Sequence, residues 1–111
     1  MSELHFNGTL TATDEDRIVA AIAPMFGGKV RRKADINFVD DTVDIAIYPD
    51  GDGGNFLISA VAQGDLAAVR PIVTRLASAL DKAGIEFVID IAREDNTDER
   101  FSNGNLGGTA L

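Results

Sequence analysis

The single histidine of this chain is the residue best suited to acid–base chemistry near neutral pH, because its ordinary pKa is about 6.5. His5 stands on the polar side of a predicted strand, and Asp44 and Asp90 fall on the same side of two other predicted strands. If these strands were neighbours, a carboxylate could orient the imidazole as a general base. One histidine without a partner motif is more typical of an exposed strand residue, so a catalytic role for His5 is the weaker interpretation.

The segment 50–55 is the nearest approach to a metal-binding motif, with two aspartates and three glycines among its residues. Carboxylate and carbonyl oxygens can converge on a hard cation where glycines permit tight turns. With Asp50 as the first position of an EF-hand loop, Asn55 and Val61 occupy the positions that require glycine and a bidentate glutamate. The segment is therefore predicted to be an acidic turn between strands rather than a calcium site.

Other catalytic and cofactor motifs are missing from the sequence. The chain has no cysteine, which excludes disulfides, thiolate metal sites and cysteine nucleophiles, and its one histidine cannot form a multi-histidine metal cage. The pair Gly27-Gly28 follows a predicted helix, whereas phosphate-binding loops precede one. No metal site and no cofactor are therefore predicted.

Charge is a strong compositional signal in this chain. Eighteen acidic residues against ten basic ones give a net charge of −8 at pH 7, and four of the bases cluster at Lys29, Arg31, Arg32 and Lys33. An acidic surface repels phosphate backbones, so nucleic-acid binding is not expected, whereas a basic protein partner would be attracted. Negative charge also favours solubility, and no apolar run reaches the roughly 20 residues that a membrane helix needs.

Hydrophobic periodicity predicts the order strand, helix, three strands, helix, strand. The strands are placed at 4–11, 29–39, 43–48, 55–62 and 86–92, and the helices within 13–27 and 65–84. This order favours an α+β fold, a two-layer sandwich with both helices on one face of a mostly antiparallel sheet of about five strands. The pattern resembles a ferredoxin-like or related arrangement with one additional strand, and no motif identifies a family.

One face of this sheet would remain uncovered by helices, and the alternation assigns polar residues to it. The predicted binding residues on this face are His5, Arg31, Lys33, Asp44, Tyr48 and Asp90. Arg31 and Lys33 could meet an anionic group, while Asp44 and Asp90 could meet a cationic one. Tyr48 is the only aromatic residue among them, so base stacking as in RNA-recognition domains is not expected. A solvated face without a binding role is the alternative.

Length and composition fit one domain, which is placed at residues 1–94. Periodicity ends after Arg93, and the segment 95–111 is rich in Asn and Gly, which predicts a flexible polar tail that is dispensable for folding. Phe101 and Leu106 could dock this tail locally. Without a basic, apolar leader at the N-terminus and without cysteine, a cytoplasmic location is the default expectation.

Three functions fit these features. A small acidic, non-catalytic protein-interaction module that self-associates as a homodimer requires nothing that the sequence lacks. An acidic inhibitor or immunity-type protein that neutralises a basic partner is supported by size and charge. A small enzyme using His5 with a carboxylate is the third, so an enzyme is the less favoured class.

The interpretation of the loop 50–55 can be tested directly. Calorimetric titration of the chain with millimolar calcium is expected to show no saturable heat, because the bidentate glutamate of a calcium loop is missing. A submillimolar dissociation constant that disappears in an Asp50→Asn, Asp52→Asn variant would contradict this expectation.

Overall fold

The structure of the chain is a computed structural model that describes residues 3–11, 14–27, 31–32, 36–39, 42–50, 55–92 and 98–110. Its elements are β1 (Glu3–Thr11), α1 (Glu15–Ile22), η1 (Ala23–Phe26), β2 (Arg31–Arg32), β3 (Ile36–Val39), β4 (Val43–Pro49), β5 (Phe56–Gln63), α2 (Leu66–Lys82), β6 (Glu86–Ala92), β7 (Asp98–Ser102) and β8 (Asn105–Ala110). The α-helix α1 passes directly into the 3₁₀ segment η1, because Pro24 cannot continue the α-helical hydrogen bonding.

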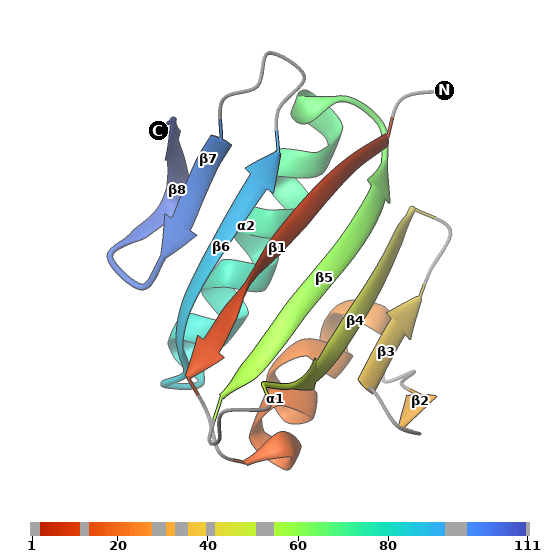
Figure 1. The fold of residues 1–111 in the computed structure, drawn as a ribbon, viewed down its shortest axis with the longest axis vertical. Coiled ribbons are helices and arrows are strands. Elements are labelled where there is room, and N and C mark those ends of the chain that lie inside the picture. Colours follow the sequence, from red (N-terminus) through yellow and green to blue (C-terminus); the bar gives the residue numbers. More distant parts are fainter. Residues whose placement is uncertain are drawn as a thin grey trace.

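All eight described strands join one sheet in the order β2-β3-β4-β5-β1-β6-β7-β8, and every described pair of neighbours runs antiparallel. The sheet is not closed, since β2 and β8 form its two edges. Both helices pack on the same face of this sheet (Figure 1). The predicted α+β sandwich is therefore confirmed, whereas the predicted number of about five strands is too small.

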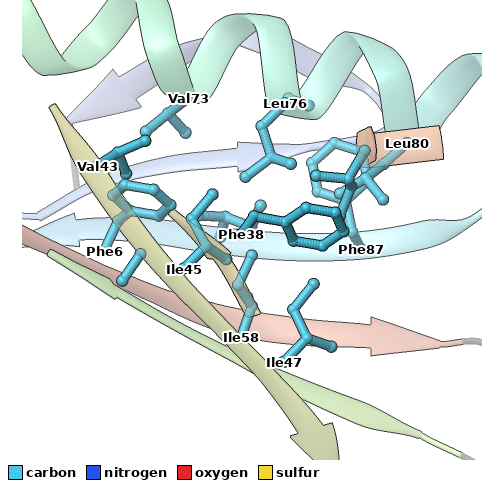
Figure 2. Packing of buried hydrophobic residues seen from close by; sticks show 14 of the residues in the cluster. Phe6, Phe38, Val43, Ile45, Ile47, Ile58, Val73, Leu76, Leu80 and Phe87 are labelled. Atoms are coloured by element: carbon cyan, nitrogen blue, oxygen red, sulfur yellow. The ribbon is translucent and has the colours of Figure 1, made fainter. Parts of the chain in front are cut away.

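The layer between the helices and the sheet is filled by large apolar side chains (Figure 2). Figure 2 labels Phe6, Phe38, Val43, Ile45, Ile47, Ile58 and Phe87 from the strands and Val73, Leu76 and Leu80 from α2, and each of these is at most 4% exposed. Phe26 of η1 stacks on Phe38 with 5.3 Å between the ring centroids. Burial of a side chain of this size contributes about 1.5–3 kcal/mol, so this layer is the main source of stability.

Helix α2 forms where the periodicity predicts it. Asp65 is its N-cap and accepts a hydrogen bond from the Ala68 amide at 3.1 Å, which satisfies an N–H group that the first turn leaves free. The buried stripe consists of Val69, Val73, Leu76, Ala77 and Leu80. Gly84 follows the helix with φ of 73°, the left-handed conformation that ends many helices.

Gly8 is the one inward position of the central strand β1 that carries no side chain. Strand β6 approaches so closely there that a Cβ atom on residue 8 would overlap the Val88 carbonyl oxygen and lie 2.8 Å from the Ile89 Cα. Both are backbone atoms, which cannot move aside as the end of a flexible side chain can. Glycine at this position therefore permits the close pairing of β1 with β6.

The predicted single strand over 29–39 is wrong, because the structure has two strands in this stretch. Strand β2 pairs antiparallel with β3, with Arg31 opposite Asn37 and Arg32 opposite Ile36. A period of two continues across such a reversal without a visible break, so alternation alone does not separate the two strands. The one irregularity in the pattern, Arg32 on the apolar side, lies opposite the buried Ile36.

The predicted tail over 95–111 is wrong for residues 98–110, which form β7 and β8. Strand β7 pairs with β6 and places Phe101 opposite Ile89, and the sheet thus extends past residue 94, the predicted end of the domain. Phe101 is fully buried in the core, and Leu106 packs against the core while partly exposed. Strand β7 shows no hydrophobic alternation in the sequence, because its two inward positions hold one apolar residue and one charged residue, Phe101 and Glu99.

Side-chain contacts outside the strand pairing also hold the C-terminal hairpin. Arg70 of α2 donates three hydrogen bonds of 2.6, 2.8 and 3.1 Å to the Glu99 carboxylate, and this hydrogen bonding raises the pKa of Arg70. Glu99 is only 4% exposed, so the guanidinium satisfies a carboxylate that the fold removes from water. Between β7 and β8, Asn103 accepts from the Phe87 amide at 2.9 Å and donates to the Ile85 carbonyl at 3.0 Å.

Removal of the C-terminal hairpin is expected to destabilise the whole fold. A chain ending at Asn96 loses the buried Phe101 and the partner of Arg70. Loss of a buried Phe side chain alone costs about 3–5 kcal/mol, a large fraction of the roughly 5–15 kcal/mol that stabilises a domain. Urea unfolding followed by circular dichroism should show a much lower midpoint or no folded baseline. A chain ending at Ala110 is the control, and equal midpoints for both chains would contradict the role of the hairpin.

Replacement of Gly8 is expected to be costly because the added methyl group meets the backbone of β6. Overpacking of this kind lowers the free energy of unfolding by about 1–3 kcal/mol. Urea denaturation of the Gly8→Ala variant is the measurement that checks this loss. Gly107→Ala is the matched control, since a Cβ atom there meets nothing within 4 Å. Equal denaturation midpoints for the two variants would show that the close approach of β6 does not constrain the protein in solution.

Candidate functional site

The face of the sheet turned away from α1 and α2 is called the open face, and it is the face seen in front in Figure 1. It is formed by the alternate residues of β1, β3, β4, β5, β6 and β7 that do not enter the core. Both described helices lie on the opposite side, so no described helix covers this surface. Because side chains alternate along a strand, the residues of the open face point away from the core and do not contribute to its packing.

Four residues form a continuous row across the open face, here called the Tyr48–Val88 row. Tyr48 of β4 pairs with Leu57 of β5, Leu57 with Thr9 of β1, and Thr9 with Val88 of β6. Strands lie about 4.8 Å apart, so the row is about 15 Å long. Val88 is 39% exposed, and the other three side chains are half-buried. Leu57 and Val88 thus give the centre of the sheet a small, partly exposed apolar area, next to the side chains of Tyr48 and Thr9, which each carry a hydroxyl group.

Carboxylates lie on both sides of the Tyr48–Val88 row, with Glu86 on one side and the other four on the opposite side. The exposed acids are Glu3, Asp44, Glu86 and Asp98, which stand at or near strand ends, and half-buried Asp90 is the fifth. Asp90 accepts hydrogen bonds of 2.9 and 3.2 Å from Arg100, and this hydrogen bonding raises the pKa of Arg100. Asp44, Glu86 and Asp98 form no salt bridge with a described cation. Arg100 is the only Lys or Arg of this face whose side chain is described, so the described side chains of the face are mostly acidic, and the register of β2 with β3 places Arg31 at the edge of the same face.

His5 is not in contact with either carboxylate that the sequence suggested as its partner. Its Nε2 atom lies 3.8 Å from the Glu3 carboxylate, and both side chains are more than half exposed. Asp44 lies across β5 from His5, since both residues pair with Val61, and two strand spacings amount to about 10 Å. Asp90 is already held by an arginine. No described contact orients His5 as a general base.

The structure places four of the six predicted binding residues on the open face, namely His5, Asp44, Tyr48 and Asp90. It does not bring all of them together, because they occupy three different cross-strand rows. Arg31 of β2 lies opposite Asn37 of β3, which is a register position of the open face, and the Arg31 side chain is outside the described part of the structure. Lys33 lies outside the described residues altogether.

Sequence reasoning missed the residues of β5 and β7 that complete the open face. The segment 55–62 is apolar almost throughout, which is typical of a strand near the middle of a sheet or of one covered on both faces. Strand β5 is indeed central, but Leu57 and Val61 lie half-buried on the open face while Ile58 is buried in the core. The available signal for apolar residues on the open face was that both the inward and the outward positions of this strand are apolar. Arg100 was missed because its segment was interpreted as a tail.

The described residues contain no group of three or more His, Asp or Glu side chains that could hold a metal ion. Among the same residues, no helix combines the length and apolar character needed to cross a membrane. Most of the loop 50–55 lies outside the described residues. No protein-family model matches the chain, and a sequence search of curated proteins finds no match.

Proposed function

We propose that this protein is a non-catalytic protein-interaction module that binds through the open face. The observation that supports this most directly is the Tyr48–Val88 row, which contains the apolar Leu57 and Val88, lies near the centre of the sheet and is uncovered by the described helices. Burial of such side chains against a partner is favourable by about 25 cal/mol per Å² of apolar surface. The carboxylates around the row correspond to the polar rim that surrounds the core of protein interfaces.

The outer surface of the helices is a weaker candidate for binding. Its exposed positions include Ala20 of α1 and Ala67, Ala68 and Arg75 of α2. Alanine offers little area to bury, and two of the three exposed helix arginines, Arg17 and Arg70, are already hydrogen-bonded within the chain. Most of the large apolar side chains of both helices are buried in the core, while Val19, Leu66 and Ile72 pack against it half-buried.

The proposal covers two occupants of the open face, a second copy of this chain in a homodimer and a different protein. Both would bury the same Tyr48–Val88 row, so the location of the surface does not depend on which occupant is bound. The two differ in the charge that they bring to the rim.

We also propose that the centre of the sheet is related to the ferredoxin-like arrangement. Two features support this relation: β1 and β4 flank β5, and β5 and β6, which α2 connects, flank β1. Interleaved strands of this kind characterise split βαβ units. The hairpins β2–β3 and β7–β8 would then be additions at the two edges.

Site-directed photocrosslinking in the cells that make this protein tests the binding surface. A photoreactive amino acid in place of Val88 is expected to capture a partner, whereas the same group in place of the exposed Ala67 of α2 is not. The mass of the adduct distinguishes a homodimer, which has twice the 11.8 kDa of one chain, from another protein. Capture from position 67 alone, or from neither position, would contradict the proposal.

Two second-site variants control the crosslinking at position 88. Tyr48→Ala removes the other end of the row and should reduce the yield, whereas Arg75→Glu on α2 should not. Both positions lie outside the fully buried core, so each variant should keep its free energy of unfolding within about 1 kcal/mol. Equal yields in the two variants would show that the row does not contribute to binding.

A further inference from the structure

We infer that the occupant of the open face is a basic surface of another protein rather than a second copy of this chain. This inference rests on the proposed function and specifies the partner of the same surface. Its basis is the distribution of charge around the Tyr48–Val88 row.

The described side chains of the open face carry five carboxylates and one guanidinium, a balance of −4 with His5 neutral. Asp90 and Arg100 neutralise each other through two hydrogen bonds. The remaining carboxylates lie on both sides of the row. Glu86 is two residues from Val88 on the same strand, which is about 7 Å, and Asp44 is four residues from Tyr48, which is about 14 Å.

This distribution is complementary to a surface with an apolar centre and a rim of Lys or Arg. Such a partner would bury the row and give each exposed carboxylate a cation at the margin of the interface. Asp44 and Glu86 have no salt-bridge partner among the described residues, so no such contact has to be broken before they bind a cation, whereas Asp98 already interacts electrostatically with Arg100. The net charge of −8 on the whole chain attracts a basic partner over a longer range and raises the association rate.

A second copy of the chain fits the same surface poorly. In a two-fold symmetric pair, each subunit presents the same surface to the other, so one acidic rim would meet another. Arg100 is the one Lys or Arg of the open face whose side chain is described, and Asp90 already holds it. Like charges placed opposite one another across an interface oppose association, and two chains of charge −8 also repel at a distance.

The inference can be tested by NMR titration of the full chain with two synthetic probes of equal length. One peptide alternates lysine with valine, and the other alternates glutamate with valine. The lysine peptide is expected to shift amides of β4, β5, β1 and β6 near the row, with an affinity that falls as salt is added. The glutamate peptide is expected to cause no shift. Equal responses to both peptides, or no response to either, would overturn the inference.

Sedimentation velocity on the same samples separates failure of this inference from failure of the proposed function. The free chain is expected to sediment as a monomer. A dimer that crosslinks through position 88 would refute the inference of a basic partner. The proposed function would survive this result, because the open face would still be the binding surface. Lysine-peptide shifts confined to α1 and α2 would contradict both proposals.

Two pairs of substitutions separate the position of charge from its amount. Asp44→Asn with Glu86→Gln, and Ala20→Lys with Ala67→Lys, each change the net charge from −8 to −6, but only the first pair lies on the open face. The first pair should weaken binding of the lysine peptide about threefold or more, as expected for two exposed charge pairs, and the second should have a smaller effect. Equal losses would show that net charge alone attracts the peptide and would overturn the inference.

Discussion

Packing of both helices on one face of the sheet is the constraint on which the rest of this structure depends. Ile18 of α1 and Val73 and Leu76 of α2 are fully buried against the inward residues of the strands. Each strand must then present its alternate residues on the other face, which neither described helix covers. That face holds polar residues that solvent can satisfy together with the Tyr48–Val88 row, which the proposed partner would cover.

The C-terminal hairpin shows how one strand serves both faces. Strand β7 directs Phe101 and Glu99 toward the helices, where the first joins the core and the second binds Arg70. On the open face the same strand supplies Arg100, which neutralises Asp90. The buried pair of Arg70 and Glu99 fixes β7 relative to α2, because separation of its partners would leave a carboxylate unpaired in the interior. The exposed pair instead determines how much negative charge the open face retains.

Sequence patterns predicted the parts of this fold in which local periodicity and burial agree. The alternation in β1, β4 and β6 and the three-to-four spacing in α2 identified these elements, because each buries one regular set of apolar residues. Strand β7 escaped detection because a buried ion pair occupies one of its inward positions, and nothing in the sequence reveals that Glu99 meets Arg70. The open face was predicted as a polar surface, but its Tyr48–Val88 row depends on strand order. Leu57, Thr9 and Val88 become neighbours only because β1 lies between β5 and β6.

The central claim is that the open face is uncovered in the free chain and available to a basic partner. Hydroxyl-radical footprinting of the free protein, read residue by residue by mass spectrometry, tests the first part most directly. Tyr48, Leu57 and Val88 are expected to be oxidised at every protein concentration, while Phe6 and Phe101 remain protected in the core. Protection of the three open-face residues in the free chain, at a level matching the core residues, would contradict this account.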